Sequence, residues 1–240
     1  MLEIFLRELA TKWNYFWRKT RNRIVSKCAE SVLTNMEIIA SFESCRATLA
    51  FERKYLREVP EFKTREKLYA YCFQKTLPDG LCLEFGTYRG DSINILAKLQ
   101  PQRHFIGFDS FIGLPVSWTT GSRTGAFNTG GRLPKVRKNI SLIKGFFNET
   151  LPYFVKQHSN EKIALIHNDS DLYSSTVTIF EELKSMIMSG SIIIFDEYYN
   201  YSEWEEGEYK AFMEFVEKYQ IKFEYIGYIR MGSQVAVRIL

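Results

Sequence analysis

The sequence contains few residues that bind transition metals: four cysteines and three histidines among 240 residues. The cysteines, Cys28, Cys45, Cys72 and Cys82, are scattered singly, and no C-x-x-C pair occurs. This spacing gives no reason to expect a zinc site. Cys82 lies in an apolar run and is predicted to be a small buried hydrophobe. Isolated cysteines are typical of a reducing compartment, so the pattern predicts a cytoplasmic protein.

The sequence also lacks long apolar runs and a strong charge bias. No run approaches the roughly 18 apolar residues of a membrane span, and the N-terminus lacks a signal-peptide pattern. The net charge is only +4, which does not indicate a nucleic-acid partner without a clustered basic face. Hydrophobic residues make up 45% and charged residues 25% of the chain, which is typical of a soluble globular protein.

Two phosphate-binding motifs are absent. The chain has no G-x-x-x-x-G-K-[ST] loop, which argues against an NTPase. It also has no G-x-G-x-x-G pattern, which argues against a dehydrogenase that binds a dinucleotide.

Residues 1–76 are predicted to form a helical extension. Apolar residues recur on one helical face, which basic residues flank. The apolar positions are Leu2, Phe5, Leu6, Leu9, Trp13, Phe16 and Trp17. We expect this stripe to pack against protein, with a homodimer favoured. Contact with a membrane surface is the alternative that a basic amphipathic helix leaves open.

Residues 77–240 show strands alternating with helices. Apolar runs predict strands at 81–85, 105–108, 140–143, 163–167, 191–195, 222–229 and 234–239. Helices are predicted at about 92–98, 175–189 and 206–219. The chain between residues 112 and 138 is predicted to be a long loop, which in a compact domain is usually functional. The expected fold is α/β: a doubly wound, mostly parallel seven-stranded sheet that ends in an antiparallel hairpin.

A glycine-containing turn follows the first predicted strand, in the segment from Glu84 to Ser92. Gly86 lets the backbone turn sharply and leaves room for a ligand. Asp109 ends the second strand, where an acid accepts hydrogen bonds from a ribose diol. Together these features favour an adenosine-containing cofactor. S-adenosylmethionine suits the site because it has no phosphate and needs no phosphate loop.

Carboxylates follow the next two predicted strands. Asp169 and Asp171 come after the fourth strand, and Asp196 and Glu197 after the fifth. Four acids at one sheet edge repel one another unless protons or cations neutralise them. Oxygen ligands suit Mg²⁺, which can orient a hydroxyl and lower its pKa. A remaining carboxylate can then act as a general base.

Several of these segments resemble the macrocin O-methyltransferase family. The resemblance rests on residues 83–90, 108–115, 144–152, 169–176 and 194–197. It implies the Rossmann-like fold of class I S-adenosylmethionine-dependent methyltransferases and transfer of a methyl group to a hydroxyl, often on a sugar of a glycosylated natural product. Some members of the family need Mg²⁺. Metal-using members tend to have two consecutive Asp residues after the fifth strand, whereas here Glu197 takes the second place.

The expected site residues form three sets, in which the resemblance assigns Glu84, Gly86, Asp109, Asp169, Asp171 and Asp196 by position. Asp171 is the expected catalytic base. The expected metal ligands are Asp169, Asp196 and Glu197. The expected cofactor-binding residues are Glu84, Gly86, Thr87, Tyr88, Arg89, Gly90, Ser92, Asp109, Ser110 and Asp169.

Other functions stay open at this point. The acceptor is expected to be a saccharide or a glycosylated small molecule, with a phenolic or lipid-linked acceptor as the alternative. A non-catalytic module that only binds S-adenosylmethionine is disfavoured, since such a module need not keep the acidic cluster. The aromatic segment 198–204 is expected to line the acceptor pocket or to pack against the long loop.

Overall fold

The computed structural model of the chain describes residues 2–118 and 122–240. It divides into two compact units, Met1–Arg46 and Ala47–Leu240. The expected boundary at residue 76 stays a prediction. The larger unit begins earlier because residues such as Phe51 and Leu56 are already buried in its core.

The first unit is helical, as the sequence predicts. Helix α1 spans Leu2–Thr34, and α2 spans Met36–Phe51. Asn35 separates them because its Oδ1 accepts hydrogen bonds from the backbone N–H groups of Glu37 and Ile38, at 2.9 and 3.3 Å, which caps α2.

The apolar stripe of α1 is only partly described. Leu9, Trp13, Phe16 and Trp17 are exposed, whereas the side chains of Leu2, Phe5 and Leu6 lie outside the described set. None of the described helices combines the length and the hydropathy that crossing a membrane requires.

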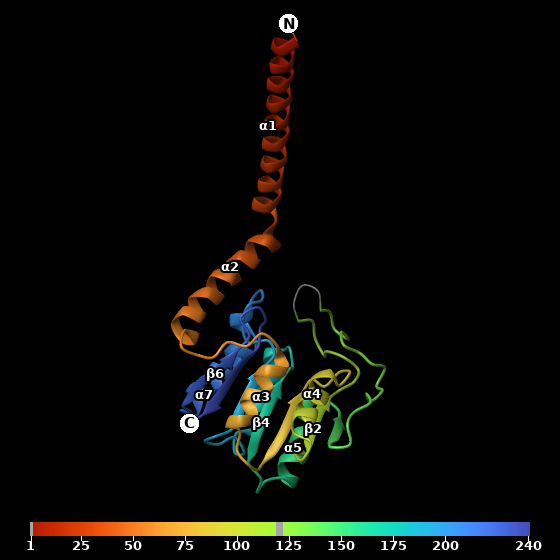
Figure 1. Cartoon of the computed structure of the whole chain (residues 1–240). Coiled ribbons are helices and arrows are strands. Elements are labelled where there is room, and N and C mark those ends of the chain that lie inside the picture. The colour runs from red at the N-terminus through yellow and green to blue at the C-terminus, as the bar shows by residue number, and fades with distance from the viewer. Residues whose placement is uncertain (1, 119–121) are drawn as a thin grey trace. The chain divides into compact units, whose positions relative to one another are not determined.

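The second unit is built on a seven-stranded sheet with the order β3-β2-β1-β4-β5-β7-β6 (Figure 1). The strands are β1 Leu81–Phe85, β2 Phe105–Asp109, β3 Ile140–Lys144, β4 Ile163–Asn168, β5 Ile192–Phe195, β6 Phe223–Tyr228 and β7 Val235–Ile239. β3, β2, β1, β4 and β5 pair in parallel, whereas β7 runs antiparallel to both β5 and β6. The predicted fold, including the terminal hairpin, is confirmed.

Helices cover both faces of the sheet. The bounds are α3 Arg65–Lys75, α4 Asp91–Leu99, α5 Phe147–Gln157, α6 Tyr173–Leu183 and α7 Glu208–Lys218. Because strand side chains alternate between faces, Leu83 packs into a core with α5, α6 and α7. Its neighbour Cys82, buried as predicted, packs into the opposite core with α3 and α4. Figure 1 shows α3 lying across the sheet at β4.

Four segments differ in detail from the sequence prediction. Helix α5 was not predicted, and it carries Pro152 in its interior. Helix α6 ends at Leu183 rather than near residue 189. A short 3₁₀ helix at Trp204–Glu206 precedes α7, and a π-helix spans Glu52–Leu56. The described residues between β2 and β3 form no helix or strand, in agreement with the predicted loop.

Candidate functional site

A cavity of about 540 Å³ opens at the carboxyl ends of the parallel strands. In open α/β sheets this is the edge where ligands bind, and the volume is within the usual range of small-molecule sites. The predicted site residues that line it are Gly86, Tyr88, Asp109, Ser110, Asp169, Asp171, Asp196 and Glu197.

The absence of a side chain at Gly86 lets the chain after β1 lie close to the chain after β4. Its φ is +91°, and a Cβ added there would lie 1.6 Å from the carbonyl oxygen of Asp169. The sequence interpretation placed a ligand beside this glycine. The backbone of Asp169 leaves no room for a Cβ on that side, and Gly86 also lines the cavity, so a ligand beside this glycine stays a prediction.

Asp109 ties the turn after β1 to the end of β2. Its Oδ2 accepts a hydrogen bond from the backbone N–H of Tyr88, and its Oδ1 accepts one from Phe111, both at 2.6 Å. Burial raises the pKa of Asp109 despite these two bonds, which act in the opposite direction. The carboxylate has further lone pairs for a ligand in the cavity.

The other predicted cofactor residues do not line the cavity. Glu84 is fully buried and bonds to His167. Thr87 and Ser92 are buried, and Gly90 precedes α4 with φ 82°. The guanidinium of Arg89 lies 4.9 Å from the ring centre of Tyr88. These five residues lie outside the lining of the cavity, and their role in cofactor binding stays a prediction.

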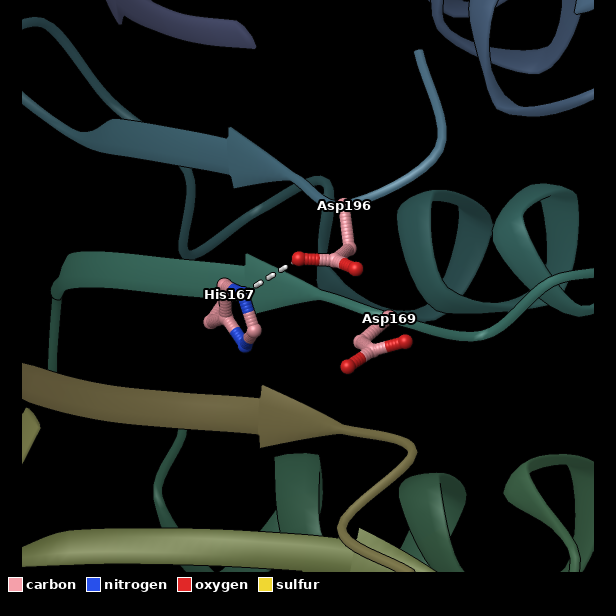
Figure 2. A group of neighbouring side chains, drawn as sticks. All are labelled: His167, Asp169 and Asp196. Atoms are coloured by element: carbon pink, nitrogen blue, oxygen red, sulfur yellow. Dashed lines mark ion pairs between the residues drawn. The ribbon is translucent and has the colours of Figure 1, made fainter. Parts of the chain in front are cut away.

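The acidic residues converge as the sequence predicts. Asp169, Asp171 and Glu197 offer oxygen atoms within 4.8 Å of one another, and so do ligand atoms of His167, Asp169 and Asp196. Figure 2 shows this second group at the ends of β4 and β5, with His167 and Asp196 joined as an ion pair.

Burial and the repulsion between neighbouring carboxylates shift the pKa values of the acidic residues in this cluster. Burial, then the nearby Asp196 and Asp109 carboxylates, raise the pKa of Asp171 to about 7. Burial also raises the pKa of Asp169 and of Glu197 well above their ordinary values. The pKa of Asp196 is lowered, because bonding to His167 and the charge of Arg65 outweigh its burial. Asp171 is thus poised to exchange a proton near neutral pH.

Three residues at this edge were missed by sequence reasoning. Nη2 of Arg65 lies 2.5 Å from Oδ2 of Asp196. The Tyr69 hydroxyl lies 2.9 Å from Nε2 of His167. Glu208 accepts hydrogen bonds from the Asn168 side chain at 2.6 Å and from the Glu197 backbone N–H at 3.2 Å. The one local signal was Thr64, a helix-capping residue type that places Arg65 in the first turn of α3.

The aromatic segment 198–204 divides between the core and the cavity mouth. Tyr198, Tyr199 and Trp204 are buried and pack around Phe51. Among the described residues, Tyr201 makes a ring contact with the long loop: its ring centre lies 5.8 Å from that of Trp118, which lines the cavity. In the described part of the loop, the expected packing is thus seen at Tyr201.

The polar groups that line the cavity fit S-adenosylmethionine. Carboxylates at Asp109, Asp169 and Asp171 face the cavity, and such groups suit a ribose diol and the cationic amino and sulfonium groups. The fit to Mg²⁺ is poorer. Oδ1 of Asp196 and Oε2 of Glu197 have no hydrogen-bond partner within the described chain, which favours an ion. The guanidinium on Asp196 opposes it, because an ion at that carboxylate would lie beside a fixed positive charge.

Comparison with known proteins agrees with this geometry. Residues 83–198 match the sequence profile of a family described as a methyltransferase domain. No curated protein matches the chain. A crystal structure of the calicheamicin methyltransferase CalS11 is similar, with 22% identity, a TM-score of 0.58, and coverage of 72% of this chain and 77% of that chain.

A second similar structure is the O-methyltransferase NovP. It has 20% identity and a TM-score of 0.54, and the match covers 72% of this chain and 78% of that chain. At these identities the likeness establishes the fold. The profile match spans the glycine turn and both acidic strand ends. The chain is therefore an S-adenosylmethionine-dependent methyltransferase with the class I, Rossmann-like fold.

Proposed function

We propose that this enzyme transfers a methyl group to a hydroxyl of a saccharide or a glycosylated small molecule. The observation that carries the proposal is Asp171, which lines the cavity with its pKa raised to about 7. A hydroxyl is a poor nucleophile at neutral pH, and a base with a pKa near the working pH is the most effective partner for it.

Asp171 would remove the hydroxyl proton as the acceptor oxygen forms its bond to the methyl carbon. S-adenosylmethionine supplies that carbon on a sulfonium, whose carbon–sulfur bond breaks and leaves a neutral thioether. Asp171 has φ 61°, an uncommon conformation for a non-glycine residue and one that often marks a functional position. Oriented reactants supply much of the rate of such a displacement.

Cofactor binding is assigned to the residues that line the cavity. Asp109 and Ser110 would hold the adenosine end, while Tyr88 and Asp169 form the wall beside Gly86. Glu84, Thr87, Arg89, Gly90 and Ser92 would act indirectly, by fixing the turn from behind. This division refines the predicted cofactor set.

The acceptor side is proposed from the aromatic pair Trp118 and Tyr201. Aromatic faces pack well against apolar ring surfaces, and Trp118 lines the cavity. The structure of CalS11 is described as that of a TDP-rhamnose 3′-O-methyltransferase, and the sequence resembles the macrocin O-methyltransferases. Both likenesses support a sugar acceptor, with a phenolic or lipid-linked acceptor as the alternative.

Other sequence predictions accompany this function. That Asp169, Asp196 and Glu197 hold Mg²⁺ stays a prediction from sequence, and the proposed methyl transfer does not require the ion. The homodimer through α1 and the cytoplasmic setting are likewise predictions.

The function is tested with S-adenosylmethionine that carries a trideuterated methyl group. The full chain is incubated with panels of nucleotide sugars, glycosides and phenols, and products are analysed by mass spectrometry. We expect a trideuteromethyl ether on a sugar hydroxyl. Transfer only to phenols would replace the proposed acceptor class. Cofactor binding without transfer to any acceptor would support the non-catalytic alternative.

A further inference from the structure

Arg65 brings a permanent positive charge to the acidic edge of the sheet. It is the first residue of α3, and the backbone N–H of Lys67 bonds to Thr64 Oγ1 and caps the helix there. Its Nη2 lies 2.5 Å from Oδ2 of Asp196, and the two side chains are 46% and 2% exposed. A guanidinium stays protonated in proteins, so the pair keeps its charges at every working pH.

The position of Arg65 is fixed by the rest of its helix. Leu68 and Tyr69 are fully buried in the core between α3 and the sheet. Tyr69 lies one helical turn after Arg65, on the same face, and its hydroxyl bonds to His167 at 2.9 Å. Both residues therefore reach the ends of β4 and β5 from one side of α3.

Two of the possible ligands for a divalent ion, Asp196 and His167, are already bonded to other side chains. Asp196 is bonded through Oδ2 to Arg65. His167 uses Nδ1 toward Glu84 at 3.0 Å and Nε2 toward Tyr69, so neither ring nitrogen is free to bind a metal. An ion on Asp196 would face the repulsion of the guanidinium or would have to displace it.

Arg65 also lines the cavity, and its half-exposed side chain has donors beyond the one on Asp196. A guanidinium carries five N–H groups in a planar fork. The groups not used by Asp196 are suited to hold an oxygen of the acceptor in the cavity that Asp171 also lines.

We propose that Arg65 supplies the fixed positive charge beside Asp196 in place of a divalent cation, and that it positions the acceptor for methyl transfer without Mg²⁺. The part of this proposal that concerns the acceptor rests on the proposed function. The part that concerns the cation rests on the ion pair alone, and it can be tested without an acceptor.

Metal binding is measured by titrating Mn²⁺, a spectroscopic substitute for Mg²⁺, into the full chain with and without S-adenosylmethionine. We expect no bound Mn²⁺ in the wild type at millimolar concentrations, and bound Mn²⁺ in Arg65→Gln, where Asp196 is freed. Arg57→Gln is the matched control, since Arg57 is exposed and does not line the cavity. Stoichiometric Mn²⁺ binding by the wild type that Asp196→Asn abolishes would overturn the proposal.

Acceptor positioning is measured with a sugar that the wild type methylates and that still carries its free hydroxyl. Arg65→Gln should raise the KM for the acceptor by about tenfold or more, the cost of a charge-assisted hydrogen bond, while the affinity for S-adenosylmethionine changes little. Arg65→Lys keeps the positive charge, so its KM for the acceptor should lie between those of the wild type and Arg65→Gln. This partial recovery would show that the effect of Arg65→Gln does not come from a folding defect. Wild-type activity that chelation abolishes and Mg²⁺ restores would contradict the proposal. A wild type that methylates no acceptor would contradict the proposed function instead, and the Mn²⁺ titration would still decide the role of Arg65.

Discussion

The backbone N–H of Tyr88 donates a 2.6 Å hydrogen bond to Oδ2 of Asp109. This bond joins the turn after β1 to the end of β2, so the two walls of the proposed cofactor site are held by a single carboxylate. Removing that carboxylate should weaken the binding of the cofactor more than the binding of the methyl acceptor.

We predict that Asp109→Ala weakens S-adenosylmethionine binding by about 1–3 kcal/mol, the cost of losing a charge-assisted acceptor. Calorimetry on the folded variant measures the change. Asp91→Ala is the control, because Asp91 is exposed in the first turn of α4. Unchanged affinity in Asp109→Ala would remove Asp109 from the cofactor site.

The raised pKa of Asp171 predicts how activity depends on pH. A base must be unprotonated to act, so kcat/KM should rise with pH through about 7, where Asp171 loses its proton. The residual activity of Asp171→Asn should lack this rise. A wild-type profile that is flat between pH 6 and 8, roughly one unit to either side of that pKa, would contradict the assignment.

The same shift makes a prediction about stability. The pKa of Asp171 is about 7 in the folded chain and about 3.9 in an unfolded one, so the folded state binds more protons between these values. The free energy of unfolding should therefore fall as pH rises from about 4 to about 7. Urea denaturation at several pH values should show a shallower fall in Asp171→Asn. An equal or steeper fall in that variant would contradict the raised pKa.

The aromatic pair at the cavity mouth predicts a change in acceptor affinity. Trp118→Ala should raise the KM for a sugar acceptor by about fivefold, or ~1 kcal/mol, with little effect on cofactor affinity. Tyr153→Ala is the control, because Tyr153 is an exposed aromatic on α5 that does not line the cavity. Equal KM values for the two variants would argue against stacking on Trp118.

The basic amphipathic helix α1 predicts a further change. Removal of residues 1–25 should convert a dimer to a monomer, or lower solubility, if the apolar stripe packs against protein. Light scattering after size-exclusion chromatography measures this. Strong, salt-sensitive binding of the full chain to anionic vesicles would instead favour contact with a membrane surface.

The sheet was predictable from sequence because each strand is a short apolar run bounded by turn residues. Parallel strands end at the same edge of a sheet, so the common location of the acids after the fourth and fifth strands was predictable as well. Helix α5 was missed because Pro152, which breaks most helices, lies inside it. Arg65 and Glu208 could not be placed, since helices far away in the sequence bring them to the site. Their pairing with Asp196 and Asn168 depends on tertiary packing, which no local pattern encodes.

The central claim is that Asp171 removes the proton from the acceptor hydroxyl. The most direct test compares the single-turnover rate of methyl transfer by the wild type and by Asp171→Asn, with S-adenosylmethionine affinity measured on the same samples. We predict a rate lower by about 10²- to 10⁴-fold in Asp171→Asn, the usual contribution of a general base, with affinity near that of the wild type. An unchanged rate in the folded variant would contradict the claim.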